Sequence, residues 1–138
     1  MSEGLNLIDC HLHLIDRSRA RYGWIDGVPL LQGRDFLLDE ALAGYGGDVA
    51  GSIFMEVDVD EASIRDEARW IGGLVKEGRL LGQIAACRPE TDESFAEWLE
   101  EAPSHGVVGL RRILHVVPDD HSESETFRAN VRRIGQAG

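Results

Sequence analysis

Two histidines lie one residue apart near the start of the chain, in the stretch IDCHLHLID at residues 8–16. Residues two apart on a β-strand project from the same side, so His11 and His13 would point together. Two neutral imidazoles aimed at one point suit Zn²⁺ or a similar divalent ion, which takes further ligands from elsewhere. The other reading is that the pair is structural, or a chance spacing among the five histidines of the chain.

Four short apolar runs could form the strands that position such a pair. They are mostly continuous rather than alternating, which is typical of strands covered on both faces in a parallel sheet. The runs cover residues 5–9, 50–57, 80–87 and 106–117. The histidines follow the first run, so they would lie at the C-terminal end of its strand.

Helical patterns separate these runs. Ile64, Ala68, Ile71 and Val75 recur at helical spacing in the clearest one. The acidic stretch at residues 58–67 is interpreted as a solvated helix face. The order along the chain is therefore a strand followed by a helix, repeated through the sequence.

Repeated βα units predict parallel strands joined by right-handed crossovers. The later units recur about every 30 residues, as in an eight-unit TIM barrel of about 250 residues. The predicted fold class is α/β, a (βα)4 half of a TIM (β/α)8 barrel, forming a single domain over residues 1–138. The alternative is an open sheet with helices on both faces. Its usual phosphate-binding turn needs glycines, and the turn DCHLHLIDRS contains none.

The composition excludes several classes of partner. A net charge of -11 repels phosphate backbones, so no nucleic acid is expected. No run approaches the roughly 20 apolar residues of a membrane helix, so no membrane partner is expected. The N-terminus lacks the basic segment and long apolar run of a signal peptide, which makes the cytoplasm the predicted location.

The stretch IDCHLHLID, with YGWI, GSIFMEVDVDEASIRDEARWI and GLRRILH after it, resembles the amidohydrolase superfamily. Within it, the chain is similar to the amidohydrolase-2 group of metal-dependent hydrolases, which includes sugar lactonases and pyrone-dicarboxylate lactonase. The resemblance implies the N-terminal half of a TIM barrel. It also implies hydrolysis of a lactone or related ester of a sugar acid or small carboxylic acid. A decarboxylase of the same superfamily is the nearest alternative reaction.

The resemblance assigns roles to individual residues. His11 and His13 match a pair that binds a divalent metal in most members, with Zn²⁺ as the expected ion, and contacts substrate in some metal-free lactonases. Arg111 matches the arginine of a Gly-x-Arg at strand four. There it could bind a substrate carboxylate or polarise a lactone carbonyl, or form a structural ion pair. Arg112 would face the opposite side, and His115 would share the face of Arg111 if the strand continued.

Two more residues are predicted to contact a small-molecule substrate. Glu56 ends the second run and could touch substrate or orient a ligand, unless it is a solvated or helix-capping carboxylate. Trp24 lies in the long loop after the first run and could stack on a ring-shaped substrate, or pack beneath the loop. His121 is interpreted as a loop residue.

The resemblance also implies residues that this sequence does not contain. The general base of the family is an aspartate at strand eight, and no residue here matches it. Three readings follow. The chain is a fragment of a longer hydrolase, a half-barrel that forms a homodimer through its exposed edges, or a non-catalytic half-barrel whose role is assembly.

Overall fold

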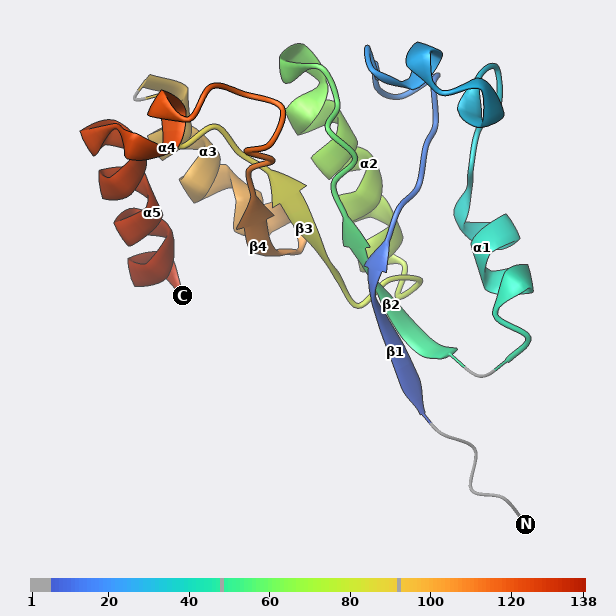
Figure 1. The fold of residues 1–138 in the computed structure, drawn as a ribbon. Helices are drawn as coiled ribbons and strands as arrows, with labels where there is room; N and C mark the ends of the chain where they lie inside the picture. The colour runs from blue at the N-terminus through green and yellow to red at the C-terminus, as the bar shows by residue number, and fades with distance from the viewer. Residues whose placement is uncertain (1–5, 48, 92) are drawn as a thin grey trace.

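The computed structural model describes residues 6–47, 49–91 and 93–138, in which strands and helices alternate (Figure 1). The strands are β1 (Leu7–Leu12), β2 (Val49–Met55), β3 (Gly82–Ala86) and β4 (Val107–Arg111). The α-helices are α1 (Leu38–Gly44), α2 (Ile64–Lys76), α3 (Glu93–Glu101), α4 (Asp120–Glu123) and α5 (Glu125–Ala137). Short 3-10 turns cover Ile25–Gly27, Pro29–Leu31, Glu61–Ser63 and Ala102–His105. Within these ranges, no helix combines the length and apolar character needed to cross a bilayer.

The strands form one parallel sheet in the order β1-β2-β3-β4. Sequential order is what successive βα units of a barrel produce, because each crossover returns to the neighbouring position. An open doubly wound sheet would instead reverse its strand order at a switch point. The predicted (βα)4 half-barrel is therefore confirmed. Figure 1 shows the helices following one another around the sheet in chain order.

The core lies between the sheet and its helices, in two clusters. In the first, Phe54 of β2 and Ile71 of α2 are fully buried. In the second, Ala85 of β3 packs with Phe95 and Trp98 of α3, each at most 4% exposed. Burying an aliphatic or phenylalanine side chain of this size contributes roughly 1.5–3 kcal/mol, so these contacts fix α2 and α3 on the sheet.

β1 and β4 are the outer strands of the described sheet. Both carry exposed apolar side chains: Leu7 and Ile8 on β1 are 49% and 57% exposed, and Val108 on β4 is 63% exposed. Apolar residues on edge strands are typical of surfaces that pair with another strand or lie under another element. The homodimer expected through these edges stays a prediction.

β4 is shorter than the apolar run that predicted it. The run extends to residue 117, but the strand ends at Arg111 and the next residues form a turn in which the Val117 amide donates to the Leu114 carbonyl over 3.2 Å. Leu114 and Val116 are 39% and 58% exposed. Apolar character alone therefore overestimated this strand, because the pairing with β3 ends at Arg111 and the residues that follow form a turn.

Candidate active site

β1 carries the two histidines to the C-terminal end of the sheet. His11 lies in β1, His13 follows its last residue, and both residues are exposed. Their ring centroids are 4.8 Å apart, with an angle of 86° between the ring planes. The structure therefore brings the pair together, as the sequence predicted, while its role in binding stays a prediction.

A hydrogen bond orients the imidazole of His13. Its Nδ1 lies 2.9 Å from the carbonyl oxygen of Met55 at the end of β2. A carbonyl can only accept, so Nδ1 carries the proton and the lone pair of Nε2 is left for a ligand. Although His13 is exposed as a whole residue, its ring is partly enclosed where it meets Met55, and this burial lowers its pKa. The nearby His11 and Arg111 lower the pKa further, against the opposing effects of the Met55 carbonyl and Glu56. The neutral imidazole, which is the form that binds metals, is therefore favoured.

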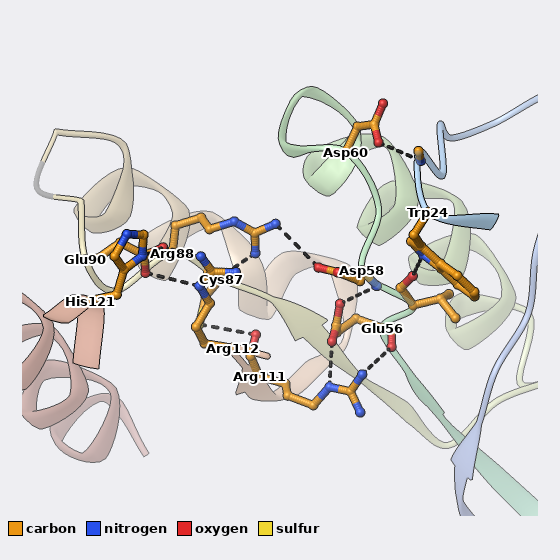
Figure 2. A network of polar contacts seen from close by, with 12 residues as sticks. Trp24, Glu56, Asp58, Asp60, Cys87, Arg88, Glu90, Arg111, Arg112 and His121 are labelled. Atoms are coloured by element: carbon orange, nitrogen blue, oxygen red, sulfur yellow. Dashed lines mark hydrogen bonds and ion pairs between the residues drawn. The ribbon is translucent and has the colours of Figure 1, made fainter. Parts of the chain in front are cut away.

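Glu56 follows β2 and pairs with Arg111 at the end of β4 (Figure 2). Nε of Arg111 donates to Oε1 of Glu56 over 2.5 Å, and Nη2 donates to the Glu56 carbonyl oxygen over 3.1 Å. The side chain of Glu56 is 1% exposed, against 28% for Arg111. The reading of Glu56 as a solvated or helix-capping carboxylate is therefore wrong, because the arginine compensates its charge inside the protein. Nη1 of Arg111 makes no hydrogen bond in the described part of the chain.

The turn after β2 is held from two sides. The Asp58 amide donates to Oε2 of Glu56 over 2.8 Å, and Asp58 has a φ of 52°, a left-handed conformation that is uncommon outside glycine. The indole Nε1 of Trp24 donates to the Val57 carbonyl over 2.8 Å, which anchors the long loop after β1 (Figure 2). Trp24 is 39% exposed, so part of its ring stays accessible. Its stacking role stays a prediction.

A buried carboxylate that sequence reasoning missed lies on α2. Glu67 is 3% exposed, and neither of its carboxylate oxygens makes a hydrogen bond of ordinary geometry among the described residues, although the Val57 amide lies near enough to favour the ionised form. Burial, followed by the charge of Glu56, raises the pKa of Glu67 to about 8, against opposing effects of the Val57 amide and Arg111. Glu67 is therefore largely protonated at neutral pH.

The acidic stretch 58–67 was interpreted as a solvated helix face, and this is wrong at Glu67. The position of Glu67 in the sequence gave a usable signal. It comes three residues after Ile64 and four before Ile71, which places it on the apolar stripe of α2. A carboxylate on the buried stripe of a helix is a candidate for a shifted pKa and for a functional role.

A separate polar cluster lies beside this site, over the end of β3 (Figure 2). Nη2 of Arg112 lies 2.5 Å from Oε1 of Glu90, and Nδ1 of His121 lies 3.5 Å from the same oxygen. Arg112 therefore forms an ion pair with Glu90, which is compatible with the structural role expected of it. His121 lies in α4 rather than in a loop. His115 follows the end of β4, so it does not share a strand face with Arg111.

The histidine pair has donor atoms of the kind that a metal site uses. Two imidazoles lie together, and the Nε2 of His13 is oriented and uncommitted in the described part of the chain, which fits the donor chemistry of Zn²⁺. No group of three or more His, Cys, Asp or Glu side chains within residues 6–47, 49–91 and 93–138 is placed to hold a metal ion. A complete site would need ligands from outside these residues.

Two solved structures are similar to nearly the whole chain. Amidohydrolase 2 from Bifidobacterium longum subsp. infantis matches with a TM-score of 0.66 and 22% identity, over 97% of this chain and 49% of that chain. A probable 2-pyrone-4,6-dicarboxylic acid hydrolase from Acinetobacter baumannii, with citric acid bound, matches with a TM-score of 0.70 and 15% identity, over 96% of this chain and 47% of that chain. A search of the curated proteins gives no significant match.

At these identities the likeness to solved structures shows the fold, which is that of one half of an amidohydrolase TIM barrel. The chain spans about half the length of both structures. A family model described as Amidohydrolase matches residues 8–138, from β1 through α5. The chain therefore belongs to the amidohydrolase family.

Proposed function

We propose that this chain forms part of the active site of a hydrolase that opens a lactone, or a related ester, of a sugar acid or small carboxylic acid with the help of a divalent metal. One observation carries the proposal. Arg111 is held by Glu56 and keeps Nη1 uncommitted in the described part of the chain. It lies close enough to His13 for its charge to act on that imidazole.

Arg111 suits a substrate oxygen that is anionic or becomes so. A guanidinium binds carboxylates well because its N–H donors lie in one plane, and Glu56 fixes that plane by accepting from Nε and by its carbonyl accepting from Nη2. The exposed part of the side chain is left to bind a carboxylate or to stabilise the oxyanion that forms from a lactone carbonyl. In this role Glu56 positions Arg111, and its own contact with substrate stays a prediction.

His11 and His13 would hold the divalent ion, with Nε2 of His13 aimed by its bond to the Met55 carbonyl. When bound, such an ion lowers the pKa of a water molecule and polarises a carbonyl. The general base that takes the proton from water would come from a segment equivalent to the half of the matched structures that this chain does not span. Residues of this chain would then orient substrate and metal, and the other segment would complete the reaction.

A carboxylated lactone is the substrate class that these residues favour. The similar Acinetobacter baumannii protein is described as a probable 2-pyrone-4,6-dicarboxylic acid hydrolase and has citric acid bound. 2-Pyrone-4,6-dicarboxylic acid combines a ring ester with two carboxylates. In this chain, Arg111 would take a carboxylate and Trp24, 39% exposed, would offer a surface for the ring.

The test is binding and turnover of a lactone panel by the purified chain with Zn²⁺ added. The panel contains sugar-acid lactones and 2-pyrone-4,6-dicarboxylate, with affinity measured by calorimetry and acid release by a pH indicator. We expect Arg111→Met, combined with Glu56→Gln so that no buried carboxylate is left without its cation, to weaken binding of the carboxylated lactone by about tenfold or more, and the exposed-site control Arg132→Met to leave it unchanged. Binding that is equal in the two variants would contradict the proposal, and release of carbon dioxide instead of acid would favour a decarboxylase.

Assembly without catalysis is the second candidate. The observation that favours it is the exposed apolar surface on the outer strands, formed by Leu7, Ile8 and Val108. A second copy of the chain is the partner that we propose for this surface, since strand edges of one sheet can pair with those of another. The proposed homodimer predicts that assembly depends on these residues and does not depend on His11 or His13.

A further inference from the structure

The strand β1 contains a bulge at the first of the two histidines. Asp9 of β1 pairs with Ser52 of β2. Three residues further along β1, Leu12 pairs with Phe54, which is only two residues further along β2. One residue of β1 is therefore extra in the segment 10–11. A bulge of this kind bends the strand and re-aims the side chains that follow it, and bulges are frequent beside active sites.

The bulge decides the side of the sheet to which the histidines point. Asp9 faces α1, because its carboxylate accepts from the hydroxyl of Tyr45, which packs against the first core cluster. Strict alternation from Asp9 would turn His11 and His13 to that same side. Instead Leu12 is buried in the first core cluster, and both histidines are exposed. The extra residue has therefore turned the histidines away from the core.

The carboxylate of Asp9 contacts the bulge from within the strand. The backbone amide of His11 donates to Oδ1 of Asp9 over 2.9 Å. The hydroxyl of Tyr45, at the end of α1, donates to Oδ2 of the same carboxylate. Hydrogen bonds to an ionised acceptor are stronger than those between neutral groups. One oxygen of Asp9 thus holds the bulged backbone, and the other is fixed by a neighbouring element.

We propose that Asp9, held in place by Tyr45, is a positioning residue for His11 and His13. It stabilises the bulge that turns both imidazoles away from the core and leaves their ring centroids 4.8 Å apart. Neither Asp9 nor Tyr45 touches the metal or the substrate in this role. The hold on the bulge stands on the contacts above, whereas its consequence for a metal ion rests on the proposed function.

Nuclear magnetic resonance of the metal-free chain tests the hold on the bulge. Asp9→Leu removes both acceptor oxygens, and Asp9→Asn keeps one acceptor oxygen for the His11 amide. Asp120→Asn, at an exposed position in α4, is the matched control. We expect a nuclear Overhauser effect between the rings of His11 and His13 in the wild type, in Asp9→Asn and in Asp120→Asn. Asp9→Leu should lose this effect while it stays folded.

A ring-to-ring effect that survives in folded Asp9→Leu overturns the proposal. If Asp9→Leu does not fold, the wild type decides. A scalar coupling across the hydrogen bond, from the His11 amide nitrogen to the carboxyl carbon of Asp9, supports the proposal. Its absence, in spectra that show such couplings between β1 and β2, overturns it.

Tyr45→Phe tests the part of Tyr45 alone, because it removes the hydroxyl and leaves Asp9 in place. The amide of His11 should then exchange with solvent about threefold faster or more, as expected when one supporting hydrogen bond is lost. An unchanged exchange rate would remove Tyr45 from the proposal.

Zinc binding, measured by calorimetry, tests the consequence for the metal separately. Residues that orient metal ligands from outside typically change metal affinity by about 10- to 100-fold, so Asp9→Leu should bind Zn²⁺ about tenfold more weakly or worse. Asp9→Asn should retain most of the affinity of the wild type. If no protein, the wild type included, binds Zn²⁺ while the ring contacts are as predicted, the metal part of the proposed function is refuted and the Asp9–His11 positioning stands. Equal affinities of the wild type and of an Asp9→Leu variant that has lost the ring contact refute the role of Asp9 in metal binding.

Discussion

Arg111 at the end of β4 and Glu56 just after β2 form an ion pair across the intervening strand β3, with Nε 2.5 Å from Oε1. The two residues are 55 positions apart in the sequence. Side chains from alternate strands meet in this way inside a β-barrel. Because Glu56 is 1% exposed, its charge depends on Arg111, and Arg111 in turn is fixed in one orientation.

Removal of Arg111 should destabilise the fold strongly. Arg111→Met leaves the buried carboxylate of Glu56 without its cation, which typically costs about 3–5 kcal/mol. Urea unfolding followed by circular dichroism measures the change, with Arg132→Met on the exposed side of α5 as the control. Adding Glu56→Gln to Arg111→Met should restore part of the loss. An Arg111→Met variant as stable as the wild type would show that Glu56 does not need its partner.

The raised pKa of Glu67 makes the free energy of unfolding depend on pH. Its pKa is raised from 4.5 to about 8, so the folded state binds more protons than the unfolded state between these values. The free energy of unfolding should therefore fall as the pH rises from about 4.5 to about 8, and then level off. At about 1.4 kcal/mol per pH unit, the full effect is on the order of 5 kcal/mol.

Glu67→Gln should remove this contribution, because an amide does not titrate. The variant and the wild type are expected to differ little near pH 5, and the variant should be the more stable one at about pH 8.5. Urea midpoints at a series of pH values check this, with Glu77→Gln as the matched control. Parallel curves for the wild type and Glu67→Gln would mean that Glu67 is ordinary in its titration.

If the exposed apolar side chains of β1 and β4 form a dimer interface, a charged side chain placed there should disrupt the dimer. A lysine in place of Ile8 or Val108 puts a charge on an apolar edge, which disfavours pairing with another strand. Sedimentation velocity of the wild type should show a dimer, and the double variant Ile8→Lys with Val108→Lys should be monomeric. Leu30→Lys is the control, since Leu30 is 88% exposed in a loop turn away from the strands. A monomeric wild type would refute self-pairing.

The strands and the histidine pair were predictable because they depend on local sequence. A continuous apolar run marks a strand in a parallel sheet, and the position of His11 and His13 after such a run places them at its C-terminal end. The structure confirms both their proximity and the order of the strands. Boundaries were less predictable: β4 ends at Arg111 because the apolar residues after it turn away rather than pair.

The pairing of Glu56 with Arg111 could not be predicted from local patterns, and the burial of Glu67 was indicated only by its helical spacing from Ile64 and Ile71. The pairing depends on which side chains the register of several neighbouring strands brings together. A glutamate in an acidic stretch looks the same in the sequence whether its carboxylate is buried or solvated. Glu67 differed from its acidic neighbours in its place on the apolar stripe of α2. The resemblance of GLRR to the family motif pointed to Arg111, but not to its partner.

The metal-binding role of His11 and His13 is tested most directly by native mass spectrometry of the purified chain in the presence of Zn²⁺. The wild type should retain a stoichiometric ion, and His115→Ala should retain it too, because His115 lies in the turn beyond β4. The double variant His11→Ala with His13→Ala should lose the ion while keeping its oligomeric state. Loss of metal in His115→Ala, or a wild type that carries no metal at all, would contradict a metal site built on the β1 histidines.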